Sequence, residues 1–261
     1  MKQRLGQHFL VNKKVLQKIA AAVNIKSSDT VIEIGPGHGE LTEILKMKNQ
    51  KSKIIAIEKD GQLAKTLKEK YKNDKNIEIV EGDALKIIPT LIQHSSFGIH
   101  HYSLVGNLPY YITGKLLRIV SELRQKPKMC VFTIQREVAE RIMATPPHMN
   151  ILAAAVQIWA EPTIIGLISP HDFNPPPKVG SAVIKLTTRN LKLTTKEQEK
   201  YYNLIKLLFK QPRKTILNNF AEGVGLSKEK AAKILQKYAI NPQDRPQNMT
   251  IEQILELSSL L

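Results

Sequence analysis

The segment VGNLPYYITG, residues 105–114, places an amide, a proline and two tyrosines directly after an apolar run. The side-chain oxygen of Asn107 and the carbonyl oxygen of Leu108 can each accept a hydrogen bond from an exocyclic amine. Two such acceptors would hold the nitrogen with its lone pair directed at an electrophile. Pro109 fixes the turn without adding a competing N–H, and Tyr110 can stack on a planar base. Taken alone, Asn-x-Pro is also explained by an ordinary turn that closes a strand.

A glycine-rich loop follows the first predicted strand. TVIEIGPGHGELT puts Gly35, Gly37 and Gly39 between a β-branched run and a helical pattern. Glycine at such a turn permits positive φ and lets the backbone approach a ligand closely. The dinucleotide fingerprint G-x-G-x-x-G fails, because position 40 is Glu. The G-x-G-x-G spacing, preceded by Glu33, resembles motif I of the S-adenosylmethionine-dependent methyltransferases. The alternative is a tight turn that binds no ligand.

Two further acids follow the next two predicted strands. Glu58 ends the second strand, where a carboxylate can accept hydrogen bonds from both hydroxyls of a ribose. Asp83 follows the third strand and could accept from an adenine amino group, although it could equally cap the helix that begins there. The carboxyl ends of parallel strands meet at one edge of an open α/β sheet. The sequence therefore predicts a cofactor site at this edge, with Asn107 beside it.

The elements that must position these residues alternate along the first two-thirds of the chain. Apolar β-branched runs predict strands at 30–34, 53–58, 77–80, 102–107, 129–135, 163–168 and 181–188. Helical patterns separate the first five, at 40–48, 61–71, 85–93 and 113–125. This alternation indicates a doubly wound α/β domain with a parallel sheet. The last two strands have no helix between them and are expected to form a hairpin.

After Arg189 the apolar residues recur with helical spacing. Helices are expected at 195–211, 212–222, 227–238 and 250–260, with N-caps at Thr195, Ser227 and Thr250. We therefore expect an α/β domain at 1–189 and a small all-α domain at 190–261.

The excess of basic residues indicates the class of molecule that the chain binds. The chain has 39 Lys and Arg against 23 Asp and Glu, a formal net charge of +16. Such an excess favours a polyanion such as nucleic acid, although general solubility would also explain it. No window approaches the roughly 18 apolar residues of a membrane span, and the N-terminus lacks the apolar run of a signal peptide, so we expect a cytoplasmic protein. The single cysteine, Cys130, is expected to be buried in a strand.

Several segments together resemble one family. They are QHFL (7–10), EIGPGHGELT (33–42), NLPY (107–110), QREVAERI (135–142), FNPPPKVGSAV (173–183) and QPRKTILNNF (211–220). NLPY is similar to motif IV of the amino-methyltransferases, the [DNS]-P-P-[YFW] group that methylates exocyclic amines of bases. Over nearly the whole chain, the sequence resembles the ribosomal RNA small-subunit adenine N6-dimethyltransferases of the KsgA/RsmA family.

The resemblance implies a Rossmann-like class I methyltransferase sheet with a small all-α C-terminal domain. It implies S-adenosyl-L-methionine as the cofactor, no metal, and dimethylation of two adjacent adenosines in 16S ribosomal RNA. Residues 1–189 would be the methyltransferase domain that binds S-adenosylmethionine, and 190–261 a helical domain that binds RNA or the ribosome. The expected partner is the 30S particle, and the protein is expected to be a monomer without membrane contact.

The resemblance also assigns residues. Those expected at the cofactor are His8, Leu10, Gly35, Gly37, Glu58, Asp83 and Asn107. Those expected at the reacting base are Asn107, Leu108, Pro109, Tyr110 and Phe173, the two aromatics enclosing the target adenine. Residues that could contact RNA phosphates, or else form a solvated charged face, are Arg136, Arg141, Arg213 and Lys214.

One residue and one segment depart from the family pattern, and one further residue has no assigned role. His8 stands where many bacterial members have Asn, and the segment MATPPHMNILA, 143–153, is shorter than its family counterpart. Tyr111 has no assigned role.

Two alternative functions remain open. One is the macrolide-resistance type of adenine dimethyltransferase, which acts on large-subunit RNA. The other is a ribosome-assembly or transcription factor that kept the fold without turnover. The FNPPPKVGSAV segment favours the small-subunit type over the first alternative, and the intact motif residues argue against the second.

Overall fold

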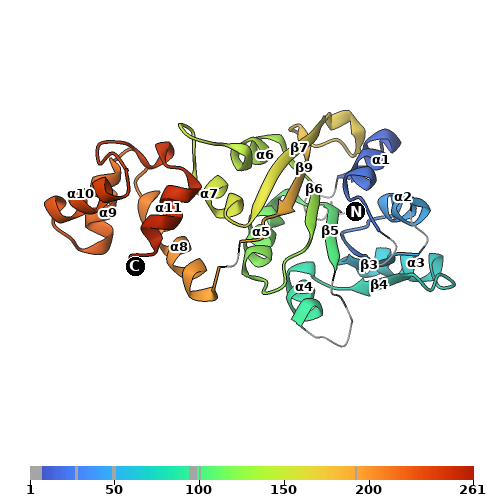
Figure 1. Ribbon diagram of the computed structural model, residues 1–261. Coiled ribbons are helices and arrows are strands. Elements are labelled where there is room, and N and C mark those ends of the chain that lie inside the picture. Colours follow the sequence, from blue (N-terminus) through green and yellow to red (C-terminus); the bar gives the residue numbers. More distant parts are fainter. Residues whose placement is uncertain (1–7, 27–28, 49–50, 94–98, 100, 192) are drawn as a thin grey trace. The chain divides into compact units, whose positions relative to one another are not determined.

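The computed structural model describes residues 8–26, 29–48, 51–93, 99, 101–191 and 193–261 (Figure 1). Gln7 of the QHFL segment lies outside them. The chain forms two compact units. The first comprises the residues up to Ala139 together with Pro162–Thr188, and the second comprises Glu140–Glu161 and Arg189–Leu261. The change of pattern expected after Arg189 falls at a boundary between the units. Residues 140–161, which the sequence placed in the first domain, belong to the second unit by their contacts.

The first unit contains a sheet of seven strands in the order β4-β3-β2-β5-β6-β9-β7. Their bounds are β2 Thr30–Ile34, β3 Lys53–Glu58, β4 Ile77–Glu81, β5 Tyr102–Asn107, β6 Met129–Gln135, β7 Ala160–Ile168 and β9 Ser181–Thr188. The strands from β4 to β6 pair in parallel, and β9 runs antiparallel to β6. The expected parallel sheet and its strands are confirmed, and β9 and β7 are neighbours, as a hairpin requires.

Helices cover both faces of this sheet, as the alternating pattern predicts (Figure 1). The expected helices are α2 Glu40–Lys48, α3 Gly61–Lys70, α4 Ala84–Gln93 and α5 Thr113–Glu122. One continuous core joins α2 and α3 to the sheet, together with α1 Lys13–Ala22, which the sequence reading missed. Leu16, Ile19 and Ala20 of α1 are buried at helical spacing, and Asn12 caps its first turn, so the signal was present.

Two short strands from distant parts of the chain also went unpredicted. β1, Phe9–Leu10, pairs antiparallel with β8, Phe173–Asn174. Two residues are too few to show a strand period, so only the long-range pairing defines them.

The second unit is helical. Its later helices are α8 Thr195–Leu208, α9 Ile216–Val224, α10 Lys228–Lys237 and α11 Ile251–Ser258. Helix α7, Ile151–Gln157, belongs to the same unit. Tyr201 of α8 donates a hydrogen bond to the carbonyl of Ala154 in α7. The sequence did not predict α6, Arg136–Met143, which crosses the boundary between the units after Ala139. No helix in the described part of the chain is long and apolar enough to cross a membrane.

The helix caps agree with the sequence at two of three positions. Ser227 and Thr250 cap α10 and α11 as expected. The cap expected at Thr195 is wrong: Thr194 caps α8, because its hydroxyl accepts from the amide of Glu197 and the Glu197 carboxylate accepts from the Thr194 amide. This reciprocal pair requires a three-residue spacing, which Thr194 satisfies.

Glu33, the acid before the glycine loop, is a buried residue of β2. Its carboxylate accepts a hydrogen bond of 2.6 Å from the Thr42 hydroxyl of α2, so the two elements that flank the loop are tied together. Burial raises the pKa of Glu33 to about 7; the Thr42 hydrogen bond lowers it in part, and the charges of Glu40 and Glu58 raise it further. Glu33 does not line the pocket described below, and we assign it a structural role.

We expect the buried carboxyl of Glu33 to make stability fall as pH rises. The unfolded chain releases this proton near the ordinary value of 4.5, whereas the folded protein holds it to about 7. Between these values the native state is progressively disfavoured, by about 3 kcal/mol in all, and the loss is complete above pH 7. Glu33→Gln, which stays neutral and can still accept from Thr42, should match the wild type near pH 5 and exceed its free energy of unfolding at pH 8.

Urea unfolding at pH 5 and pH 8 measures this difference. Glu69→Gln is the matched control, because Glu69 is an exposed acid that is not among the charges acting on Glu33. A Glu33→Gln curve with the same pH dependence as the wild type would show that Glu33 is already ionised in the folded protein.

Candidate methyltransferase site

A pocket of about 410 Å³ opens at the carboxyl ends of β2, β3, β4 and β5. The predicted site residues that line it are His8, Gly35, Gly37, Glu58, Asp83, Asn107, Leu108, Pro109, Tyr110 and Phe173. Leu10 is the exception, because its side chain packs in the hydrophobic core, where β1 pairs Leu10 with Phe173. Residues of the lining that the sequence reading left out include Phe9, Lys59, Asp60, Tyr111 and Ile112. The strand topology thus gathers residues that are up to 165 positions apart (His8 to Phe173).

The glycine loop approaches its neighbours so closely that a side chain would not fit at Gly37. This residue has φ +61°, and a Cβ there would lie 2.9 Å from the ring of Phe9. The Phe9 ring in turn packs against His38 of the loop, with centroids 4.5 Å apart. Both the backbone conformation and the contact therefore require glycine. The loop presents backbone rather than side chains to the pocket.

Glu58 joins the loop after β2 to the loop after β3. Glu58 is only 5% exposed. One carboxylate oxygen accepts a hydrogen bond of 3.1 Å from the amide of Gly37, and the other accepts one of 2.9 Å from the amide of Asp60. A carboxylate offers about four lone-pair positions, so both oxygens keep acceptor capacity after these two bonds. The predicted ribose-binding acid is therefore held in one orientation by the backbone.

Asp83 caps α4, which is one of the two roles that the sequence left open, and it also lines the pocket. One oxygen accepts from the amide of Leu85 at 3.0 Å, as a cap of α4, and the other accepts from the ammonium of Lys59 at 3.0 Å. Burial alone would raise the pKa of Asp83, but the hydrogen bonds from Lys59 and from the Leu85 amide hold it below its usual range. The carboxylate is thus ionised and lines the pocket as an acceptor.

The NLPY segment leaves β5 where that strand lies against β2. A Cβ at Gly106 would come within 2.4 Å of the Ile34 carbonyl oxygen, so only glycine permits this approach. The next residue, Asn107, donates its side-chain amide N–H to the carbonyl of His8 at 2.7 Å. This bond orients the amide and leaves its oxygen as an acceptor. The Leu108 amide donates to Thr133 of β6 at 3.1 Å, which fixes the turn.

Aromatic side chains surround the same end of the pocket. The Tyr110 hydroxyl lies 2.8 Å from the Ser181 hydroxyl, and its ring stacks with that of His8 at 6.3 Å between centroids and 30° between planes. His8 donates through Nδ1 to the carbonyl of Pro175 at 2.8 Å. Phe173 is buried and lines the pocket. The β1–β8 pairing is what brings His8 and Phe173 to this place.

The basic residues expected at RNA are exposed. Arg136 and Arg141 lie on α6, and Arg213 and Lys214 lie in the loop before α9. Lys214 forms an ion pair of 3.3 Å with Glu222.

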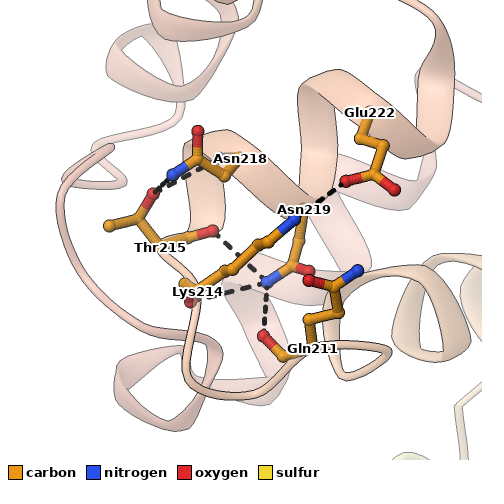
Figure 2. Close-up of polar contacts among 6 residues, drawn as sticks. All are labelled: Gln211, Lys214, Thr215, Asn218, Asn219 and Glu222. Carbon is orange, nitrogen blue, oxygen red and sulfur yellow. Dashed lines mark hydrogen bonds and ion pairs between the residues drawn. The ribbon is translucent and has the colours of Figure 1, made fainter.

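One buried side chain holds the loop that carries Arg213. Figure 2 shows Asn219 of α9 pointing back into residues 211–215, where its amide nitrogen lies 3.0, 3.3 and 3.5 Å from the carbonyl oxygens of Gln211, Thr215 and Lys214. Asn219 is only 5% exposed. The loop is therefore fixed from within, and its exposed Arg213 is presented on a defined backbone.

Comparisons with known proteins agree with this geometry. The family model described as ribosomal RNA adenine dimethylase matches residues 1–261. A protein of Dehalococcoides mccartyi named ribosomal RNA small subunit methyltransferase A is 37% identical over 251 residues, covering 95% of this chain and 84% of that protein.

Two solved structures share the fold over almost all of the chain. A dimethyladenosine transferase from Plasmodium falciparum is 28% identical with a TM-score of 0.78, and the match covers 96% of each chain. The 23S rRNA methyltransferase ErmE is 24% identical with a TM-score of 0.76 over 96% of this chain and 98% of that one, a likeness of fold alone. With the Rossmann-like sheet, the motif residues at its carboxyl edge and a family match over the whole length, the chain belongs to the ribosomal RNA adenine dimethylase family.

Proposed function

We propose that the protein transfers methyl groups from S-adenosylmethionine to N6 of two adjacent adenosines in 16S ribosomal RNA, dimethylating each. The observation that carries this proposal is the orientation of Asn107. Its N–H is bonded to the His8 carbonyl, so its oxygen is the atom available to a donor. The pocket that it lines also contains three acids and four Phe or Tyr side chains. An exocyclic amine of a base is a donor of the kind that this acceptor would take.

The residues present fit the cofactor. Glu58 would accept from the ribose hydroxyls, Asp83 from the adenine amine, and the loop at Gly35 and Gly37 leaves room for close approach. Two buried or paired carboxylates also suit a ligand with a positive charge. When bound, the cofactor supplies a methyl group activated by its sulfonium.

The chain's own residues orient the nucleophile. The N6 lone pair of adenine is delocalised into the ring, so the amine must be held pyramidal to react. The Asn107 side-chain oxygen and the Leu108 carbonyl oxygen would accept its two N–H bonds, which places the lone pair toward the methyl group. Tyr110 and Phe173 would enclose the ring. The new N–C bond would form as the bond from the methyl carbon to sulfur breaks, which leaves S-adenosylhomocysteine. The methylated amine is acidic and its proton would pass to a nearby carbonyl or to water, so no dedicated base is required.

The substrate and partner follow from charge and from the relatives. The net charge of +16 suits a phosphate backbone, and the Dehalococcoides relative is named for the small subunit. We assign cofactor binding to the first unit and RNA or 30S contacts to the exposed basic residues of the second. We also expect the protein to act as a monomer in the cytoplasm, where ribosomes assemble.

Methyl transfer to ribosomal particles tests the proposed function. With tritiated S-adenosylmethionine and 30S particles from a strain that lacks the modification, we expect label in 16S RNA, mapped as dimethyladenosine at two neighbouring positions. The same protein offered 50S particles should transfer none. Label only in 23S RNA would assign the large-subunit type of enzyme, and tight 30S binding without label would assign a non-catalytic assembly factor.

Asn107→Ala should reduce methyl transfer by about 10²–10³-fold, the usual effect of removing one group that stabilises a transition state. Single-turnover transfer to 30S particles at saturating cofactor measures it. Tyr111→Phe serves as the matched control in the same segment, because Tyr111 is given no role in orienting N6. Equal rates for Asn107→Ala and the wild type, with both proteins folded by thermal unfolding, would contradict the account of N6 orientation.

Arg213→Ala should weaken binding to 30S particles and reduce the slope of log affinity against log salt by about 1, the effect of losing one phosphate contact. Filter binding from 50 to 300 mM KCl measures both. Lys233→Ala is the control, because Lys233 is an exposed lysine of the same unit that pairs with Glu229. An unchanged slope for Arg213→Ala would place the RNA contact elsewhere.

A further inference from the structure

We propose that Lys59 competes with the adenine ring of the cofactor for the carboxylate of Asp83. The adenine amine would bind Asp83 more tightly once the Lys59 ammonium has left it. The inference rests on the proposed role of Asp83 as the acceptor for the adenine amine. Lys59 lines the pocket but belongs to neither the glycine loop nor the NLPY motif.

The two carboxylate oxygens of Asp83 are both engaged. Oδ1 accepts from the Leu85 amide at the start of α4, a bond that cannot be given up without uncapping the helix. Oδ2 accepts from the Lys59 ammonium at 3.0 Å. An adenine amine approaching through the pocket is also a donor, and Oδ2 is the oxygen that does not cap α4. Oδ2 keeps a second lone-pair position, but an oxygen already bonded to an ammonium is a weaker acceptor for a second donor. Two donors, one of them a full positive charge, then converge on one atom.

The other two acids that line the pocket in the described part of the chain are held by backbone amides. Glu58 directs its oxygens to the amides of Gly37 and Asp60. Asp60 caps α3, accepting from the amides of Gln62 and Leu63. Of the acids that line the pocket, only Asp83 pairs with Lys59. The displaced ammonium therefore moves to water, which its 67% exposed side chain permits.

Tyr111 is a further residue that lines the pocket near Lys59. Its side chain is 60% exposed, and its ring lines the same pocket. The pKa of Lys59 is raised, first by the hydrogen bond and charge of Asp83 and to a smaller extent by the Tyr111 hydroxyl. Lys59 thus lies beside Asp83 at the proposed adenine end of the pocket.

The size of the effect follows from the exposure of the pair. Exposed ion pairs contribute up to about 1 kcal/mol, so the competition costs up to about 5-fold in cofactor affinity. Salt weakens such a pair. Cofactor binding should therefore tighten slightly as salt rises, whereas binding of RNA phosphates weakens.

Calorimetric titration with S-adenosylhomocysteine tests the inference. This ligand lacks the sulfonium charge, so a changed affinity does not report long-range attraction of a cation. At 50 mM KCl we expect Lys59→Met to bind it about 2- to 5-fold more tightly than the wild type, and at 500 mM KCl the difference should shrink. Lys86→Met is the matched control: Lys86 is an exposed lysine near Asp83 whose charge acts on the same carboxylate. It should leave the affinity unchanged.

Asp83→Asn separates failure of this inference from failure of the site assignment. Asn keeps an oxygen that can cap α4 but replaces Oδ2 with a donor. If Asp83→Asn leaves the affinity for S-adenosylhomocysteine unchanged, Asp83 does not bind the adenine. If Asp83→Asn weakens binding while Lys59→Met binds as the wild type or more weakly, Asp83 keeps its role and the competition by Lys59 is overturned. Equal tightening by Lys59→Met and Lys86→Met would also overturn it, because net charge alone would then explain the change.

Discussion

The parallel register of β2 with β3 and β5 is the constraint on which the rest of the structure depends. Ile34 pairs with Ile57, and Glu33 with Val105, so the three strands end at almost the same level. The glycine loop, Glu58 and Asn107 consequently leave the sheet at one edge and can share a pocket. A slip of one residue would turn each of these side chains to the opposite face. Gly106 permits this register, because any larger residue would strike the Ile34 carbonyl.

A second set of contacts closes the proposed site from outside the sheet. His8 offers its carbonyl to Asn107 and its ring to Tyr110, while Phe9 packs on Gly37. These contacts depend on the pairing of β1 with β8, two segments more than 160 residues apart (Phe9 with Asn174). The short antiparallel ladder therefore positions the residues at the proposed reacting end of the pocket, and the parallel sheet positions those at the proposed cofactor end. The orientation of the Asn107 amide belongs to both, since its backbone comes from β5 and its hydrogen-bond partner from β1.

The sequence predicted well those parts of the fold that local patterns specify. Buried strands have long apolar β-branched runs, and residues at their ends are recognisable because turn chemistry interrupts the run. The sequence did not predict the contacts between distant segments. Residues 140–161 join the second unit because Tyr201 bonds to Ala154, a pairing that no local pattern encodes. The same holds for the ion pair of Lys59 with Asp83. Asp83 was a predicted site residue and Lys59 follows another one, but only their distance shows that they interact. The N-cap of α8 was misplaced for a smaller reason, since Thr194 and Thr195 are adjacent and only the bond to Glu197 distinguishes them.

The charge distribution of the pocket explains how a strongly basic protein can admit a base without admitting its phosphate. Glu58, Asp60 and Asp83 line the pocket, and each accepts hydrogen bonds from backbone amides. These amides fix the three carboxylates in place, so their oxygens cannot rotate away from the pocket. A phosphate would be repelled there, whereas a cationic methyl donor and a neutral purine would not. The positive charge needed to hold RNA is therefore expected on residues that do not line the pocket, such as the exposed Arg141 and Arg213. Separating the two signs of charge in this way leaves the extruded base as the part of the RNA that the site favours.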